Sequence, residues 1–295
     1  MTISKQLITT SDELIARAVA IAEAGRKPTV AVAAAQDADV IGAVAEARSD
    51  GFLEAVLFGD RDRIKVLAAE TDTDISDIKV VHEPDTTRAA HGAARMASEG
   101  KAGAIMKGFL PTSALLRTVL DKQYGLRGKN TLSHCAVLDI PGHHKLLNFT
   151  DGGMVVSPTT DQKMQILENA VLVARALGIS PVKIAVSGPS LRAVDGVPHT
   201  INDSETLAVQ AAAELQDIVI AAPMPLEIAL SKAAAGHGPA AEEVAGDADI
   251  FLVDSIEEGN IVAKSLIQFA RAVFAGVIVG ARVPVSLVSR TDTVK

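Results

Sequence analysis

The chain has 295 residues, of which 48% are hydrophobic and 22% are charged, so it is not a disordered protein and can form one large or two ordinary domains. Its net charge of −8 excludes general nucleic-acid binding, which needs a basic surface, but allows a local group of cations to bind a small anion. The single cysteine, Cys135, excludes an internal disulfide and is typical of a reducing cytoplasm. No apolar run approaches the ~18 residues of a membrane span, and the amino terminus lacks a signal-peptide pattern. We therefore expect a soluble cytoplasmic protein without membrane or nucleic-acid partners.

Short β-branched segments alternate with helical segments in the first part of the chain. Ser11 is the expected N-cap of the first helix, and Asp85 is a possible cap for the fourth. Alternation of strand and helix predicts right-handed crossovers and a doubly wound parallel sheet. The expected strands are 29–35, 53–58, 78–82 and 104–106, and the expected helices are 12–24, 39–49, 60–69 and 87–98.

The polar, glycine-bearing segment 124–130 indicates the approach to a domain boundary. Beyond it, strand-like segments at 133–138 and 145–149 are separated by Pro141 and Gly142, which predicts a hairpin or an edge pair. A helix at 162–177, ended by Gly178, precedes a second alternating series, and 188–198 is a long loop. That series consists of strands at 182–186, 218–221, 250–253 and 276–279, with helices at 203–215, 226–235 and 260–270.

Three generic motifs are better explained without a functional site. The 236–241 segment resembles a dinucleotide fingerprint but follows a helical stretch and has a proline where the binding helix would open. His143 and His144 are neighbours on a turn, and solvated histidines explain them better than a metal site, so no metal is expected. Cys135 and His134 point apart on a strand, which favours a buried thiol over a nucleophile pair.

The carboxyl end of the strand near 104–106 carries a candidate anion site, because ligands bind at this edge of doubly wound sheets. Lys107 and Gly108 end the strand, and a proline, Thr112 and Ser113 open a helix that carries Arg117. Free backbone N–H groups and hydroxyls at a helix start bind anions well. An ordinary capped helix with a solvated Lys and Arg explains the same spacing equally well.

Two further strand ends carry candidate substrate-binding residues. Asp151 precedes two glycines that allow the backbone to approach a ligand closely, although a glycine turn with a capping Asp is the simpler explanation. Glu258 and Asn260 open a helix that carries Lys264. The acidic residue is explained by helix capping, whereas Asn260 offers a donor and an acceptor that helix stability does not require.

The chain closes on a buried-looking strand followed by Ser289, Arg290 and Asp292. A serine can hydrogen-bond a developing charge, an arginine binds phosphate through two hydrogen bonds, and an aspartate can accept a proton. A polar tail is the alternative. The combination of these three side chains favours a catalytic role.

Taken together, these segments resemble the phosphate acetyltransferase and phosphate butyryltransferase family, with a closer likeness to the butyryltransferase branch. The resemblance runs from about Val30 to Asp292, and its motifs occur in the family's order. They are Met106-Lys107-Gly108 followed by Arg117, the stretch 151–163, Gly246-Asp247-Ala248-Asp249, Glu258-Gly259-Asn260, Gly280-Ala281-Arg282-Val283-Pro284 and Ser289-Arg290-Thr291-Asp292.

The resemblance implies a fold like that of isocitrate and isopropylmalate dehydrogenases, with two α/β/α domains, mainly parallel sheets and a cleft between the domains. The first domain would comprise 1–132 and 283–295, and the second 133–282. A homodimer is the usual assembly of this family. The last strand would return to the first domain, so that Ser289 and Arg290 would lie near Lys107 and Arg117.

The resemblance also implies a short-chain acyltransferase that converts acyl-CoA and phosphate into acyl phosphate and coenzyme A, without a metal or prosthetic group. Coenzyme A is then a substrate rather than a cofactor. Ser289 would stabilise the tetrahedral intermediate or the departing sulfur, Arg290 and Arg117 would bind phosphate, and Asp292 would be the base. Thiols of pKa ~8.5 are mostly protonated at neutral pH, so the reverse reaction needs that base.

Departures from the family pattern keep two alternatives open. Family members commonly continue past the Ser-Arg segment into a final helix, and they carry polar residues where this chain has Ala221-Ala222-Pro223 and Glu227-Ile228. A non-catalytic relative that binds coenzyme A or an acyl phosphate is the first alternative. An oxidoreductase on the related fold is the second, although its metal-dependent members need clustered Asp ligands that the sequence does not show.

Overall fold

The computed structural model describes residues 6–188, 200–235 and 243–287. Contacts divide the described residues into two compact units, one formed by 12–129 with 276–287 and the other by 6–11 with the described part of 130–275. The boundary at 129/130 lies within a few residues of the expected 132/133, but 276–282 groups with the first unit and 6–11 with the second. Whether each unit is a domain that folds independently stays a prediction.

The first unit is a mainly parallel sheet with the strand order β3-β2-β1-β4-β11-β10. All of its pairs are parallel except β10 with β11. The expected alternation of strand and helix is therefore confirmed here. Its strands are β1 (Thr29–Ala33), β2 (Glu54–Gly59), β3 (Lys79–His82), β4 (Ala104–Lys107), β11 (Val285–Leu287) and, from Gly276 onward, β10 (Val273–Val279).

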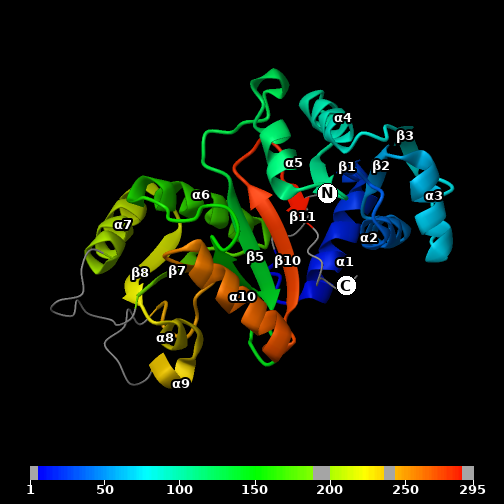
Figure 1. Cartoon of the computed structure of the whole chain (residues 1–295). Helices are drawn as coiled ribbons and strands as arrows, with labels where there is room; N and C mark the ends of the chain where they lie inside the picture. The colour runs from blue at the N-terminus through cyan, green and yellow to red at the C-terminus, as the bar shows by residue number, and fades with distance from the viewer. Residues whose placement is uncertain (1–5, 189–199, 236–242, 288–295) are drawn as a thin grey trace. The chain divides into compact units, whose positions relative to one another are not determined.

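Helices cover both faces of this sheet, as Figure 1 shows in blue and cyan. On one face α4 crosses β1, β2 and β4 at close range, because Gly92 leaves room for the Phe58 ring and five alanines of the helix are buried. On the other face α2 and α3 pack on alternate strand residues such as Val32 and Leu57. The bounds are α1 (Ser11–Ile21), η1 (Ala22–Arg26), α2 (Ala38–Ser49), α3 (Arg61–Glu70), α4 (Thr86–Ser98), α5 (Thr112–Val119) and η2 (Lys122–Tyr124).

The second unit repeats this architecture, with the strand order β5-β6-β9-β7-β8. Its only antiparallel pair among the described strands is β5 with β6, so the hairpin expected around Pro141 and Gly142 is confirmed. Its strands are β5 (Ser133–Asp139), β6 (Leu147–Thr150), β7 (Val182–Ser187), β8 (Ile218–Met224) and β9 (Ile250–Leu252). Its helices are α6 (Thr160–Ala176), α7 (Thr200–Glu214), α8 (Leu226–Leu230), α9 (Lys232–Ala235) and α10 (Ile256–Ala270).

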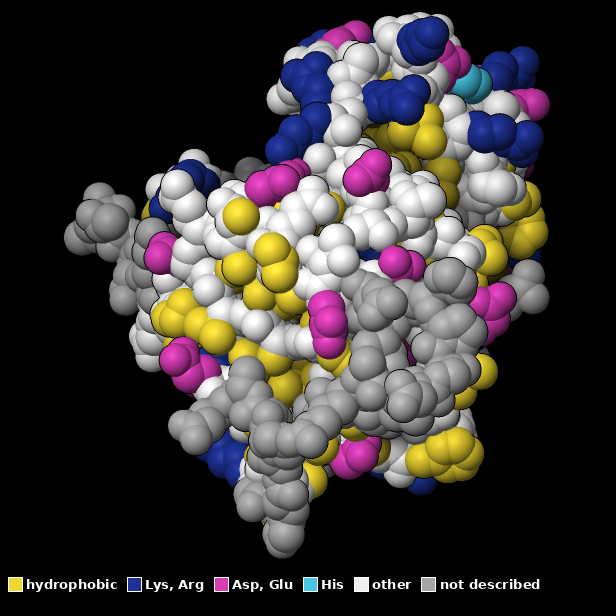
Figure 2. Space-filling view, turned by 90° about the vertical axis from the view of Figure 1, so that its left-hand side faces the viewer, with side chains coloured by type: hydrophobic (Ala, Val, Ile, Leu, Met, Phe, Trp, Pro, Cys, Tyr) yellow, Lys and Arg dark blue, Asp and Glu magenta, His cyan; other side chains and the backbone are white. Residues whose placement is uncertain are grey.

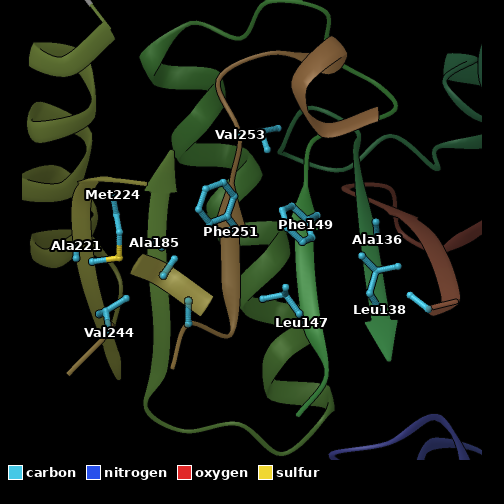
Figure 3. Close-up of a cluster of buried hydrophobic side chains, with 13 residues drawn as sticks. Ala136, Leu138, Leu147, Phe149, Ala185, Ala221, Met224, Val244, Phe251 and Val253 are labelled. Atoms are coloured by element: carbon cyan, nitrogen blue, oxygen red, sulfur yellow. The ribbon is translucent and has the colours of Figure 1, made fainter. Parts of the chain in front are cut away.

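The core of the second unit lies between its sheet and α8 and α10, and is built from small aliphatic residues around two phenylalanines (Figure 3). Phe149 of β6 and Phe251 of β9 are neighbours across the strands, with ring centroids 5.4 Å apart. Helices α6 and α7 cover the opposite face of the sheet. An α/β/α sandwich with few aromatic residues follows from the Ala, Val, Ile and Leu content of the chain.

Three expected helices have different ends in the structure. The one expected over 226–235 is two short helices, because Ser231 is extended and its hydroxyl accepts the Ala234 N–H at 3.3 Å. Helix α10 begins four residues earlier than expected, because Ser255 is its N-cap and accepts the Glu258 N–H. Ser11 is the first residue of α1 instead of its cap, and its hydroxyl donates to Asp139.

The described residues include no helix that is both long enough and apolar enough to cross a bilayer. The loop expected over 188–198 lies almost wholly outside the described residues.

Candidate functional site

The carboxyl end of β4 carries Lys107 and Gly108, as expected. The last strand returns beside it, since β11 pairs with β4 in parallel and Leu287 lies opposite Lys107. Lys107 Nζ donates to the carbonyl oxygens of Gly108 at 3.1 Å and Leu110 at 3.5 Å. Gly108 packs so tightly that a Cβ there would lie 2.1 Å from the Ala34 carbonyl oxygen. The lysine therefore lies under a tight turn at the edge where parallel sheets bind ligands.

Helix α5 begins directly after this turn and carries the two other candidate residues of the first unit. Its N-cap is Pro111, which makes no side-chain cap hydrogen bond, and Thr112 is the first helical residue. Arg117 is exposed in the last turn, with its Nε donating to the Ser113 carbonyl oxygen at 3.2 Å. At 1.5 Å per residue, Thr112 and Arg117 are about 7.5 Å apart along the helix axis.

Basic side chains gather locally on the first unit (Figure 2), although the whole chain is acidic. Dark-blue side chains gather at the top of Figure 2, at the height where Figure 1 shows α4 and the segment after α5. An isolated bridge between Arg127 and Ala281 brings the exposed Arg127 and Arg282 onto adjacent segments, and Arg282 donates to the Gly125 carbonyl oxygen at 3.3 Å. A local positive field of this kind attracts anionic substrates in spite of the net charge.

In the second unit, Asp151 follows β6 and is only 3% exposed. Its carboxylate accepts four backbone N–H groups, those of His134 at 3.2 Å, Gly153 at 2.9 Å, Met154 at 3.0 Å and Val155 at 3.0 Å. Burial raises the pKa of Asp151, and these four hydrogen bonds oppose the increase. Both carboxylate oxygens are engaged within the protein, so the side chain folds the glycine loop.

That loop contacts the start of α10 directly. A Cβ on Gly152 would lie 2.8 Å from the Gly259 carbonyl carbon, and a Cβ on Gly259 would lie 2.6 Å from the Gly152 Cα. Asn260 Nδ2 approaches the Gly152 carbonyl oxygen at 3.5 Å, and the Asn260 side chain is exposed. The structure therefore brings Asp151, Asn260 and Glu258 together at one edge, while Lys264 is exposed one turn further along the helix.

Glu258 is a bridge between strand ends in the structure. Its Oε1 contacts the Ser187 hydroxyl at the end of β7, and its Oε2 accepts the Asp254 N–H at 2.8 Å after β9. Lys163 of α6 is 7% exposed and forms an ion pair with Asp254. Sequence reasoning missed Ser187, Asp254 and Lys163 as members of this group. The strand-end rule alone would have identified the first two.

The histidine and cysteine pairs have structural roles. Burial raises the pKa of the Cys135 thiol to about 12 and lowers the pKa of His134 to about 4, so both are neutral near pH 7. The His134 ring packs against Phe274, with centroids 5.9 Å apart. His144 is exposed, as expected, and its Nε2 lies 2.7 Å from Asp247 Oδ1.

The Gly246–Asp249 motif forms a charge network around the amino ends of β6, β7 and β9. Asp249 is 4% exposed and accepts Lys145 Nζ at 2.6 Å and the Lys183 N–H at 2.7 Å. Asp247 contacts Lys145 at 3.0 Å and Lys183 at 2.5 Å. Since ligands bind at the carboxyl ends, this motif holds the strands together and lies outside the candidate site.

Ser289, Arg290 and Asp292 lie outside the described residues, as does the 236–241 segment. Among the residues that the structure describes, no group of three or more His, Cys, Asp or Glu side chains is arranged to hold a metal ion. The expected absence of a metal or prosthetic group from the reaction stays a prediction.

Comparison with known proteins gives consistent matches. Residues 85–295 match a family model described as phosphate acetyl/butaryl transferase. The chain is 38% identical to the phosphate butyryltransferase of Clostridium acetobutylicum over 270 residues, covering 90% of this chain and 88% of that protein. It is 33% identical to the phosphate acetyltransferase of Thermotoga maritima over 269 residues, covering 91% of each. A crystal structure of a branched-chain phosphotransacylase from Enterococcus faecalis V583 superimposes with a TM-score of 0.78 at 29% identity, covering 90% of this chain and 94% of that one.

Proposed function

Because the chain belongs to the phosphate acetyl/butaryl transferase family and is therefore a phosphate acyltransferase, we propose that butyryl and branched short acyl groups are its substrates. It moves an acyl group between coenzyme A and inorganic phosphate. The higher identity to a butyryltransferase than to an acetyltransferase supports the preference, and so does the branched-chain relative of known structure. The family excludes the oxidoreductase alternative.

The proposed reaction joins phosphate to the acyl carbon in two steps. A phosphate oxygen attacks the thioester carbonyl, and the tetrahedral intermediate collapses with loss of the coenzyme A thiolate, which takes up a proton. In reverse, the thiol loses its proton to a base, and its sulfur attacks the acyl phosphate. Holding both substrates in position itself supplies several kcal/mol of the acceleration.

The residues assigned to these steps lie on or directly after β4, α5 and β11. Lys107, Arg117 and Arg290 bind the phosphate, Ser289 donates a hydrogen bond to the developing charge, and Asp292 takes the thiol proton. The pairing of Leu287 with Lys107 is the observation that carries this proposal, because Ser289 and Arg290 follow Leu287 by two and three positions. For the second unit, we propose that Asn260 and Lys264 contact coenzyme A and that Asp151 and Glu258 shape the backbone there.

The activity is tested by phosphate-dependent release of free thiol from butyryl-CoA and acetyl-CoA. We expect release with both and a higher kcat/KM with butyryl-CoA. Absence of phosphate-dependent release with every short acyl-CoA contradicts the activity, and tight coenzyme A binding without turnover would indicate the non-catalytic relative.

The phosphate assignment is tested with Arg290→Ala. Its KM for phosphate should rise far more than its KM for coenzyme A, because the guanidinium binds one substrate only. Arg63→Ala, which removes an exposed arginine of α3, is the matched control and should leave both values unchanged. An equal rise of the two KM values in Arg290→Ala would mean that the residue is wrongly assigned. Ser289→Ala should lower kcat with little change in stability.

A homodimer is proposed from the outer face of α10. Gly259 is the one buried residue of this helix, while Ile261 is 66% exposed and Phe269, two turns along, is 84% exposed. Val273, just after the helix, is 38% exposed and extends the apolar surface. Interfaces between identical chains are enriched in apolar and aromatic residues and bring the same patch of two copies together.

Light scattering after size exclusion tests the assembly. Phe269→Glu should convert a dimer into a monomer, whereas Val209→Glu, at a 73% exposed position of α7, should leave the dimer intact. Helix α7, which carries this control position, lies on the side of the molecule that faces the viewer in Figure 2. A monomeric wild-type protein, or a dimer that only Val209→Glu disrupts, would contradict the proposal. The cytoplasmic location stays a prediction.

A further inference from the structure

The turn after β4 fixes the backbone on both sides of Phe109. The Gly108 N–H donates to the Ala33 carbonyl oxygen at 2.9 Å, and the Phe109 N–H donates to that of Ala34 at 2.6 Å. Lys107 Nζ bonds to the carbonyl groups of the residues on either side of Phe109. Leu110 closes the turn by donating to the Gly108 carbonyl oxygen at 2.9 Å. The backbone position of Phe109 is thus set by hydrogen bonds to the residues after β1, by the Lys107 side chain and by the bond that closes the turn.

The side chain of Phe109 points away from this packed base. Ala33 and Ala34 are fully buried and Leu110 is 8% exposed, yet Phe109 is 64% exposed. Single exposed hydrophobic residues are ordinary on protein surfaces. This ring differs in its location, because it stands at the carboxyl end of a parallel strand, on a rigid turn and beside a candidate phosphate-binding lysine.

We propose that Phe109 contacts the acyl chain of acyl-CoA and sets the preference for acyl length. The proposal rests on the proposed function and extends it to a specificity-determining residue. Inorganic phosphate has no apolar surface, so within these substrates the ring can contact the acyl chain, the methylene and methyl groups of the pantetheine arm, or the adenine of coenzyme A.

Distance along the chain decides between the acyl chain and the adenine. Phe109 is two residues beyond Lys107, so their Cα atoms are at most about 7 Å apart. The acyl carbon receives the phosphate, and Lys107 is proposed to hold that phosphate. The adenine is separated from the acyl carbon by the pantetheine arm and the pyrophosphate. The distance therefore favours a contact at the acyl end of the substrate over one with the adenine, and the dependence on acyl length separates the acyl chain from the pantetheine arm.

The test is a series of acetyl-, propionyl- and butyryl-CoA with saturating phosphate. In the wild type, kcat/KM should rise by about fourfold per added methylene, the factor that corresponds to burial of one CH2 group. In Phe109→Ala, kcat/KM should be nearly the same for the three acyl-CoAs. In Phe109→Leu, kcat/KM should still rise with acyl length, but by a smaller factor. Leu120→Ala, at an exposed leucine just beyond the far end of α5, is the control and should keep the wild-type series.

Other outcomes overturn the proposal. Phe109→Ala could instead lower kcat/KM by the same factor for every acyl length. If that loss disappears when acyl-pantetheine replaces acyl-CoA, the ring contacts the adenine. If kcat/KM depends on acyl length in Phe109→Ala as it does in the wild type, Phe109 does not determine the preference for acyl length. Because the side chain is exposed, the variant should unfold at the same temperature as the wild type, which separates a lost contact from a lost fold.

A binding measurement keeps this test independent of turnover. Without phosphate, calorimetry should give a Kd that falls with acyl length in the wild type and stays constant in Phe109→Ala. If no phosphate-dependent thiol release occurs, the proposed function fails, yet this comparison still decides whether Phe109 contacts the acyl chain. Equal trends in the two proteins would contradict the contact.

Discussion

Two helix-interior glycines should respond to the same substitution with opposite signs. Gly42 in α2 has no atom within 4 Å of the position that a Cβ would occupy. Gly259 in α10 has the Gly152 Cα at 2.6 Å and the Val253 Cγ2 at 2.9 Å from that position. Alanine favours a helix interior over glycine by about 1 kcal/mol, so any difference between the two sites reports the contact with the Asp151 loop.

The magnitude follows from the geometry. Gly42→Ala should stabilise by about 0.5–1 kcal/mol. At Gly259 the new methyl needs about 3.4 Å, and the 2.6 Å available would force backbone to move. Overpacking of this kind costs about 1–3 kcal/mol, and rigid backbone places the cost near the upper end, leaving a net loss of about 2 kcal/mol after the helix gain. The two variants should therefore differ by about 3 kcal/mol.

Urea unfolding followed by circular dichroism measures this difference, with kcat/KM as a second readout. Gly259→Ala should also lower kcat/KM, because Asn260 and the Asp151 loop are displaced together. The m-value should stay constant if only stability changes. A Gly259→Ala protein as stable as Gly42→Ala would refute the close contact between the loop and α10.

Three further predictions follow from two buried groups, Cys135 and Asp249, and from the half-buried Asp247. Native protein at pH 8 should not react with a thiol reagent at Cys135, because burial keeps this thiol protonated. The unfolded protein should react. Rapid labelling of the native protein would contradict the burial of Cys135. Asp249→Asn should lower the free energy of unfolding, measured in urea, by about 2–3 kcal/mol. The substitution leaves Asp247 as the one remaining carboxylate partner of Lys145, and it gives the Lys183 N–H a weaker acceptor. An unchanged midpoint would contradict the network. Burial opposes ionisation of Asp247, but hydrogen bonds from Lys183, His144 and Lys145 outweigh it and lower its pKa. The stability difference between wild type and Asp247→Asn should therefore be constant above about pH 4 and shrink below it, and a difference that grows in acid would refute this sign.

Strands and helices in both units were predictable where local signals agree with tertiary packing. The Asp85 cap is confirmed by a hydrogen bond to the Arg88 N–H at 2.8 Å. The helix expected over 162–177 has four buried residues on the expected face, Met164, Leu167, Val171 and Ala174. Periodicity identifies such elements because one face must be buried whatever the neighbouring element is.

The roles of polar residues were less predictable. Asp151 and Glu258 were chosen as substrate-binding residues from their position after strands. The structure confirms that position, but their oxygens are occupied by protein donors, and their role in substrate binding stays a prediction. Lys163 lies in a helix that reads as ordinary, and only the fold brings it to Asp254. A carboxylate in a sequence carries no sign of which donors will surround it.

By itself, the sequence determined the fold class, the family motifs and the strand ends that carry the candidate residues, since these depend on local periodicity and residue type. Only the tertiary structure decided that β11 lies beside β4, that Gly152 and Gly259 touch, and that Phe109 is exposed on a rigid turn. These features join residues that are distant along the chain, or depend on the direction of one side chain. Hydrophobic pattern constrains neither, because it specifies which face is buried and leaves the partner of that face open.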